Sequence, residues 1–137
     1  MSRLVIDCSI ALSWCFEDES AEETDALLDR VREEGGVVPG LWHLELANVL
    51  LQAERRRRIS AEDAATRLRL IADLPILTDQ ETTTRAWHDI LSIARVEGVT
   101  TYDAAYLELA IRLGASLLTK DDALIQAARR RGVVALP

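Results

Sequence analysis

Four acidic residues stand where carboxylates from distant parts of the chain can meet: Asp7, Glu45, Asp103 and Asp121. Asp7 ends an apolar segment that reads as a strand, and Asp121 follows a second such segment in LLTKDD. Asp103 lies in the first turn of the helix that leads into this second strand. If the two strands are neighbours where the order of a parallel sheet reverses, one cleft receives all three acids. Glu45 can join them from a helix that follows another strand.

Carboxylates gathered in this way repel one another unless they bind protons or hold a cation. A set of oxygen ligands without His or Cys favours Mg²⁺ or Mn²⁺ over zinc. Such an ion binds phosphate oxygens, lowers the pKa of a bound water and stabilises the leaving oxygen of an in-line displacement. The four acids together therefore point to hydrolysis of phosphodiester bonds.

Each acid also has a simpler explanation. Asp7 can cap the turn after its strand, and either Asp121 or Asp122 can cap the last helix. Asp103 can be an ordinary first-turn acid, which the helix dipole keeps ionised. For Glu45 the simpler explanation is a solvated surface position. It is weaker, because Glu45 lies among apolar neighbours on a helix that we expect to be buried, where an unpartnered carboxylate is costly.

The chain alternates apolar strand patterns with helical ones, which indicates a parallel sheet covered on both faces. We therefore expect a three-layer α/β/α sandwich with a mostly parallel sheet, and one domain over residues 1–137. The predicted strands are 3–7, 37–38, 76–77, 115–118 and 133–136. The predicted helices are 9–16, 20–34, 41–57, 60–74, a helix from 79 or 82 to 97, 101–113 and 121–131. We interpret the helical hairpin 41–74 as an addition to this domain rather than as a second domain.

Several helix ends carry capping signals. Ser20 with Glu23 matches a capping box, and Ser60 matches the cap of the second helix of the hairpin. Thr100 or Thr101 is expected to cap the helix of Asp103, and Gly114 to end it in a left-handed conformation. Apolar residues run nearly all round the start of helix 41–57, so we expect that start to be largely buried.

The composition narrows the class of protein. With 137 residues and a net charge of −7, the chain is not a bulk binder of polyanions, which would be basic. It has no apolar run long enough for a transmembrane helix and no signal-peptide layout, so we expect a cytoplasmic protein without a membrane partner. The spacing of Cys8 and Cys15 fits neither a zinc site nor a disulfide framework, which leaves two small packed thiols.

Four segments carry a resemblance to a known family: LVIDCSI, PGLWHLELANVL, TTYDAAYLELA and LLTKDDAL, in that order. The chain resembles the PIN-domain ribonucleases, and most of all the VapC-type toxins of prokaryotic toxin–antitoxin pairs. The similarity runs through nearly the whole chain, and TTYDAAYLELA is its most specific segment. The resemblance implies a PIN-like fold and a Mg²⁺- or Mn²⁺-dependent endoribonuclease that acts on RNA, binds a cognate antitoxin and forms a homodimer.

Carried over by position, the resemblance implies metal-binding carboxylates at Asp7, Glu45, Asp103 and Asp121. In the family the fourth acid follows a Thr by two positions, which selects Asp121 after Thr119 rather than Asp122. Ser9 matches a small polar position that supports the site, and Thr119 is a second supporting candidate. Asn48, one turn beyond Glu45, faces the same way and is a further supporting candidate.

The remaining polar and aromatic residues have structural interpretations, functional ones, or both. The arginines at 55–58 and 129–131 either complement helix dipoles as solvated ends or contact RNA phosphates. Lys120 beside Asp121 is the better candidate for a phosphate contact. Trp14 and Trp42 are read as packing residues, near which an apolar groove would suit an antitoxin segment, and His43 and His88 as structural.

Other function classes fit the residues less well. A haloacid-dehalogenase-like phosphatase needs a second Asp two residues after the first, where this chain has Ser9. A receiver domain needs a Lys after its fifth strand, and a cysteine phosphatase needs an Arg six residues after its Cys; neither is present. A stand-alone RNA-processing PIN nuclease and a PIN-like fold with an inactive site stay open.

Overall fold

The computed structural model describes residues 3–137 and contains a five-stranded, all-parallel sheet. Its strands are β1 (Leu4–Ile6), β2 (Gly36–Val38), β3 (Ile76–Thr78), β4 (Ser116–Leu118) and β5 (Ala135–Leu136). They lie in the order β3-β2-β1-β4-β5. Val5 aligns with Val37 on one side and with Leu117 on the other, so β1 is the middle strand.

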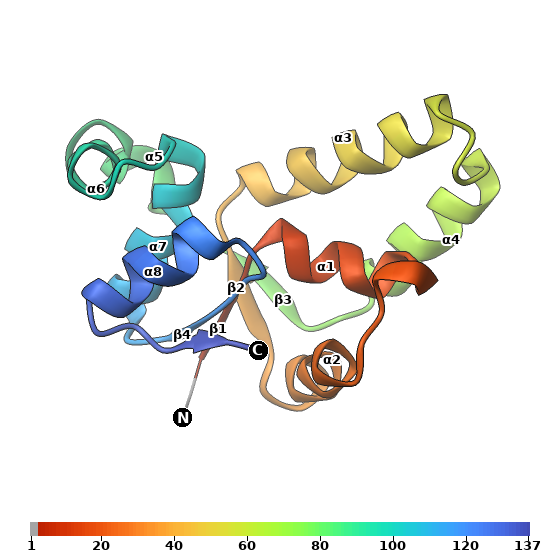
Figure 1. The fold of residues 1–137 in the computed structure, drawn as a ribbon, viewed down its shortest axis with the longest axis horizontal. Helices are drawn as coiled ribbons and strands as arrows, with labels where there is room; N and C mark the ends of the chain where they lie inside the picture. Colours follow the sequence, from red (N-terminus) through yellow and green to blue (C-terminus); the bar gives the residue numbers. More distant parts are fainter. Residues whose placement is uncertain (1–2) are drawn as a thin grey trace.

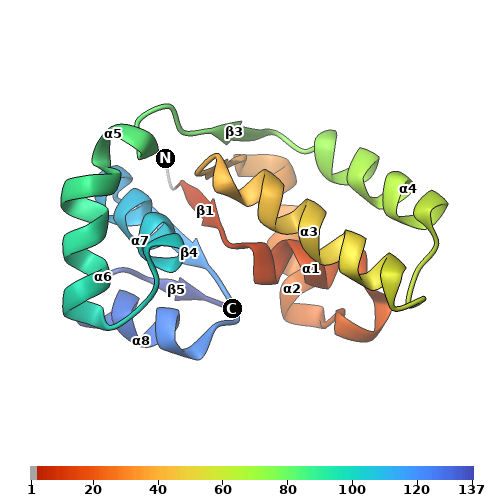
Figure 2. The ribbon, with the colours of Figure 1, turned by 90° about the horizontal axis from the view of Figure 1, so that it is seen from above.

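Helices cover both faces of this sheet, which confirms the expected three-layer architecture. The first group is α1 (Cys8–Cys15), α2 (Glu22–Glu34), α3 (Leu41–Arg55) and α4 (Ala61–Ala72), with a short 3-10 turn at Glu17–Glu19. The second group is α5 (Thr82–Arg85), α6 (Leu91–Glu97), α7 (Thr101–Leu113) and α8 (Asp122–Arg130). Figures 1 and 2 show α1–α4 on one side of the sheet and α5–α8 on the other.

The core is centred on β1, β4 and α7. Every residue of β1 is buried, as is each residue of α7 from Ala104 to Ala110. The middle strands are apolar on both faces because both faces are covered by helices. α7 packs on β1, β4, α6 and α8, so its position relative to the sheet is fixed on several sides.

Three predicted caps are present. Thr100 Oγ1 accepts a hydrogen bond from the Asp103 amide at 3.1 Å, and Ser60 Oγ accepts one from the Asp63 amide at 3.0 Å. Gly114 ends α7 with a φ of 62°, in the left-handed region where a Cβ would be strained. The segment from Asp103 to β4 is therefore built as the sequence indicates.

The expected capping box at Ser20 is wrong. α2 begins at Glu22 with Ala21 as its N-cap, one position later than predicted. Thr24 satisfies the turn instead, since its hydroxyl accepts from the Ala21 amide at 3.1 Å and donates to the Ala21 carbonyl at 2.9 Å. The buried Thr24 competes successfully with the exposed Ser20 for the start of this helix.

The expectation that the start of α3 is buried nearly all round is also wrong. Trp42, Leu46 and Leu50 face the core, but Leu44 is 76% exposed and Leu51 is 40% exposed. On α7, Ile111 leaves the predicted apolar stripe and is 41% exposed. A helix at the edge of a small domain contacts the core along one stripe only, whatever its remaining residues are.

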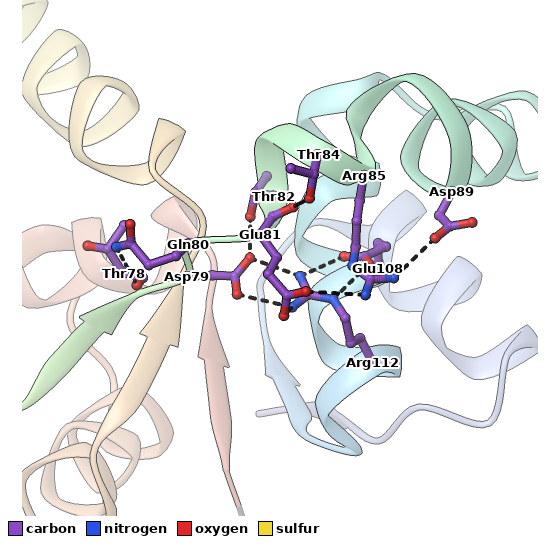
Figure 3. A network of polar contacts seen from close by, with 10 residues as sticks. All are labelled: Thr78, Asp79, Gln80, Glu81, Thr82, Thr84, Arg85, Asp89, Glu108 and Arg112. Carbon is purple, nitrogen blue, oxygen red and sulfur yellow. Dashed lines mark hydrogen bonds and ion pairs between the residues drawn. The ribbon is translucent and has the colours of Figure 1, made fainter.

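The predicted helix ending at Glu97 forms as three consecutive pieces, because a π-helical turn at Ala86–Ile90 separates α5 from α6. An ion network joins this segment to α7 (Figure 3). Arg112 donates to Asp79 at 2.9 and 3.0 Å and to Glu108 at 2.9 and 3.1 Å. Because the side chains of Arg112, Asp79 and Glu108 are only 13%, 10% and 5% exposed, the network links the end of β3 to α7 inside the molecule.

Over residues 3–137, none of the helices combines the length and the apolar character that a membrane crossing requires.

Candidate active site

The order of the strands reverses between β1 and β4. From β1 the chain proceeds through β2 to β3 on one side, and it then returns to place β4 and β5 on the other side. Asp7 follows β1 directly, and Asp121 comes three residues after the end of β4. The structure therefore meets the condition set by the sequence, because the two acids leave neighbouring strands at the carboxyl edge of the sheet.

Asp7 is buried, with 6% of its surface exposed, and two hydroxyl groups hold one of its oxygens. Its Oδ2 accepts a hydrogen bond from Thr119 Oγ1 at 2.7 Å and another from Ser9 Oγ at 2.9 Å. Burial raises the pKa of Asp7, the two hydroxyl donors oppose this shift, and the nearby charge of Asp121 adds to it. Asp7 is also the N-cap residue of α1, but its side chain makes no capping hydrogen bond.

The same two hydroxyl groups join the ends of β1 and β4. Thr119 Oγ1 accepts from the Asp121 amide at 3.0 Å while it donates to Asp7. Ser9 Oγ accepts from the Lys120 amide at 2.9 Å while it donates to Asp7. The carboxylate of one strand end is thus linked to the backbone of the other through Ser9 and Thr119, two of the three residues predicted to support the site.

Glu45 approaches this group from the first turns of α3. Its Oε1 accepts a hydrogen bond from the hydroxyl of Tyr106 at 2.5 Å, and Tyr106 is fully buried on α7. Burial raises the pKa of Glu45, the Tyr106 hydroxyl lowers it, and the charges of Asp7 and Asp103 raise it further. Glu45 is half-buried, and its carboxylate interacts with the charges of Asp7 and Asp103, as the sequence indicates. Its surroundings are less buried than we expected, because its neighbours Leu44 and Ala47 are exposed.

Asp103 and Asp121 lie at the starts of two helices on the same side of the sheet. Asp121 is exposed and caps α8, because its Oδ1 accepts from the Leu124 amide at 2.9 Å. Asp103 is half-buried in the first turn of α7. Its pKa is raised by burial first and then by the charges of Asp121 and Asp7. The expected stabilisation of the ionised form by the helix dipole is therefore outweighed here.

The four predicted carboxylates form one electrostatic group. Each interacts with at least one of the others strongly enough to raise a pKa, and three of the four have raised pKa values. As their side chains stand, no three His, Cys, Asp or Glu side chains within residues 3–137 are arranged to hold a metal ion. The fold therefore brings the four carboxylates into one region, but their side chains do not form a coordination shell in this conformation.

Tyr106 is a residue of this region that the sequence did not single out. It lies three positions after Asp103 on the same helix, so both side chains project from one face of α7. This three-residue spacing is the feature of the sequence that could have pointed to Tyr106. The partner of Tyr106 is 61 residues away in the chain, and that pairing depends on how the fold brings the start of α3 near α7 at the carboxyl edge of the sheet.

The other candidates are placed as follows. Asn48 is exposed on α3, and Lys120 is exposed beside Asp121. Arg58, from the run at 55–58, pairs with Asp18 at 2.7 Å and lies 3.8 Å from the centre of the Phe16 ring, which is a structural role. Cys8 and Cys15 are buried, and burial together with Glu45 raises the pKa of Cys8 to about 12.

Trp14 and Trp42 pack as predicted, since the Trp14 indole donates to the Thr24 carbonyl at 2.8 Å and Trp42 is 4% exposed. At the other helix end, Arg130 and Arg131 both pair with Glu97, at 2.7 and 2.9 Å. These contacts favour the structural interpretation of both residues over a contact with RNA.

The fold and the site together define a class of protein, namely a doubly wound parallel α/β domain with a group of acidic residues at its switch point. The family described as PIN domain matches residues 4–130 of this sequence. The chain therefore belongs to the PIN domain family.

Individual relatives agree with this assignment. Ribonuclease VapC3 of Pyrobaculum aerophilum is 27% identical over 124 residues, which cover 90% of this chain and 93% of that protein. The crystal structure of PAE2754 from the same organism superposes with a TM-score of 0.71 at 21% identity, covering 98% of this chain and 89% of the other.

Two further solved structures share the fold. VapBC2 from Rickettsia felis, bound to a DNA fragment from its promoter, gives a TM-score of 0.70 at 13% identity and covers 97% and 96% of the two chains. FitAcB from Neisseria gonorrhoeae gives 0.66 at 16% identity, with 98% and 96% covered.

Proposed function

We propose that this protein is a divalent-metal-dependent endoribonuclease and the toxin of a toxin–antitoxin pair. The observation that carries the proposal is the meeting of Asp7, Glu45, Asp103 and Asp121 at the switch point of a PIN domain. Membership of the family and the similarity to a protein named ribonuclease VapC3 support the same activity. RNA is the proposed substrate.

The donor set fits Mg²⁺ or Mn²⁺. All four side chains offer carboxylate oxygens. Burial first, and then the charges of neighbouring acids, raise the pKa values of Asp7, Glu45 and Asp103, and a bound cation would offset both effects. Asp7, Glu45, Asp103 and Asp121 would hold the ion, after side-chain rotation that brings them closer together. A divalent ion at such a site supplies Lewis acidity toward phosphate oxygens and a lowered pKa for a bound water.

The protein's own residues prepare the site in distinct ways. Ser9 and Thr119 fix the orientation of Asp7 through hydrogen bonds to Oδ2. Lys120, whose amide is held by Ser9, extends from the same loop as Asp121 and is the proposed contact to an RNA phosphate. A cationic side chain beside the acids would offset the repulsion between the phosphate backbone and a chain of net charge −7.

The direct test is cleavage of RNA by the purified protein with Mg²⁺ or Mn²⁺. We expect cleavage that a chelator stops. Asp103→Asn should fold normally, because asparagine nearly matches aspartate in volume, but should lose cleavage by about a hundredfold or more. Full activity in Asp103→Asn, or cleavage that persists in chelator, would contradict the proposed metal site.

We also propose an antitoxin partner and a homodimer. The relatives named VapC3 and VapBC2 support the first, and exposed apolar side chains on three elements, Leu44, Leu77 and Trp87, support association in general. A short antitoxin-like reading frame beside this gene would support the toxin assignment over a stand-alone RNA-processing nuclease. Light scattering on the pure protein tests the dimer, and a monomer at all concentrations would contradict it.

A further inference from the structure

We infer that Tyr106 is a positioning residue that anchors Glu45 to α7, so that Glu45 and Asp103 are presented to a divalent cation as one preset pair. The inference rests on the proposed function, because it concerns the same carboxylates. It adds a role for a residue that is not one of the four acids and that acts on the site through its hydrogen bond to Glu45.

The contact between the two residues has the features of a positioning hydrogen bond. Tyr106 is completely buried, so its ring has no freedom to follow a moving partner. Its hydroxyl lies 2.5 Å from Glu45 Oε1, a short distance typical of a hydroxyl donating to an ionised carboxylate. A long glutamate side chain on the half-exposed start of α3 is thereby held by a rigid group of the core.

The geometry on α7 explains why the anchor matters for a metal. Asp103 and Tyr106 are three residues apart on one helix face, so the hydrogen bond from Tyr106 fixes Glu45 relative to the helix that carries Asp103. Ser9 and Thr119 do the same for Asp7 on the other side of the site. Two of the four carboxylates thus each have one oxygen held by a hydroxyl donor, as is common for residues that bind metals.

A purely structural role for Tyr106 makes a different prediction. In that case its hydroxyl would serve only to satisfy buried polar groups, and removing it would lower stability without a specific effect on metal affinity. Metal affinity measured on folded protein without RNA therefore separates the two roles, and it does not depend on catalytic turnover.

The test is Mn²⁺ binding to Tyr106→Phe, measured by isothermal titration calorimetry. The substitution removes one hydroxyl and keeps the buried ring. We expect the dissociation constant to rise about tenfold, as for other partners of metal ligands. Tyr102→Phe is the matched control, because Tyr102 is the only other tyrosine, lies on the same helix and is 64% exposed. Its affinity should equal that of the wild type.

A double-mutant cycle with Glu45→Gln shows whether the effect passes through Glu45. In the Glu45→Gln background, Tyr106→Phe should change the Mn²⁺ dissociation constant by less than about twofold, since the anchored carboxylate is already absent. An unchanged affinity in Tyr106→Phe alone, or an equal loss in both backgrounds, would overturn the inference. Wild-type protein that binds no Mn²⁺ would instead contradict the proposed function, and this inference with it.

A second measurement leaves position 106 intact and so does not depend on the folding of Tyr106→Phe. Tyr102→Phe protein labelled with ¹³Cζ-tyrosine has a single tyrosine resonance, that of Tyr106. We expect the chemical shift of this resonance to change when Mg²⁺ is added to the labelled protein. Without Mg²⁺, it should also differ between this protein and the same protein with Glu45→Gln. A resonance that saturating Mg²⁺ leaves unchanged would overturn the inference.

Discussion

At the scale of single residues, Thr119 shows how the site is held. Its side chain is fully buried and its hydroxyl makes two hydrogen bonds, one to Asp7 Oδ2 and one from the Asp121 amide. One hydroxyl group thereby fixes both a carboxylate after β1 and the loop after β4. Asp121 likewise has two functions, since it caps α8 and belongs to the acidic group.

Thr119→Val removes this hydroxyl with almost no change in volume. We expect the variant to lose about 1–3 kcal/mol of unfolding free energy, because it leaves the buried Asp7 carboxylate short of a donor. Urea denaturation measures the loss. Thr83→Val, at an exposed position of α5, is the control and should change little. Equal stability of Thr119→Val and wild type would mean that the hydrogen bond to Asp7 contributes nothing.

The sequence was informative about these residues when their positions depended on local structure. Asp7, Asp103 and Asp121 are placed by a strand end or a helix start, which periodicity and capping signals reveal. The hydrogen bond between Tyr106 and Glu45 was not predictable in this way, because it joins residues 61 positions apart that only the tertiary fold brings together. The raised pKa of Asp103 was missed for the same reason, since burial and neighbouring carboxylates are tertiary effects.

At the scale of elements, the ion network of Figure 3 holds α7 from its far end. Arg112 lies on the last turn of α7, and its guanidinium joins Asp79, at the end of β3, to Glu108 on α7 itself. Since α7 also carries Asp103 and Tyr106, this network helps to fix the helix on which half of the candidate site depends.

Asp79→Asn should therefore lower stability in a pH-dependent way. The hydrogen bonds from Arg112 lower the pKa of Asp79 from 3.8 to about 2. A carboxylate with a lowered pKa contributes stability above its unfolded pKa and loses it as pH falls toward the folded value. We expect Asp79→Asn to cost about 2 kcal/mol near pH 7, and the difference from wild type to vanish between pH 4 and pH 2.

Chemical denaturation at several pH values measures this difference. Asp89→Asn is the matched control, because Asp89 pairs with Arg85 in the same network but its side chain is 61% exposed. That variant should stay within about 0.5 kcal/mol of wild type. A pH-independent loss in Asp79→Asn would show that the ion pair is not its cause.

The order of the elements was predicted because alternating strand and helix patterns leave few topologies for a parallel sheet. Their exposed faces were not predicted. The residues of α3 alone do not show that Leu44 faces away from the core while Leu46 faces it, since both are leucines. The π-helical turn between α5 and α6 likewise left no signal that periodicity detects.

At the scale of the whole molecule, the charge distribution matters more than the total of −7. Burial and neighbouring acids raise the pKa values of Asp7, Glu45 and Asp103, so these three groups bind more protons in the folded protein than in the unfolded chain. These groups therefore favour the folded state at low pH, and their contribution is lost as pH rises through their folded pKa values. At neutral pH the burial of these charges and the repulsion between them destabilise the fold, and a bound cation would offset that effect.

Mg²⁺ should consequently stabilise the protein at pH 7.5. At a concentration about 100 times its dissociation constant, an ion that binds only the folded state adds about 2.7 kcal/mol, or roughly 6–10 °C in Tm. The gain should disappear as pH falls toward 4, and the loss should begin above the ordinary values of 3.8 and 4.5 because the three pKa values are raised. Calorimetric melts, with NaCl at matched ionic strength as the control, measure it. An equal effect of NaCl would indicate screening rather than a site.

The central claim is that four carboxylates at the carboxyl edge of the sheet form the metal site of a ribonuclease. It is tested most directly by the Mg²⁺-dependent rate of RNA cleavage in Asp121→Asn and Asp122→Asn. The two residues are adjacent and exposed, and asparagine caps a helix as well as aspartate does, so both variants should keep α8 intact. We predict that Asp122→Asn cleaves at close to the wild-type rate and that Asp121→Asn loses about a hundredfold or more. Equal rates in the two variants would contradict the claim.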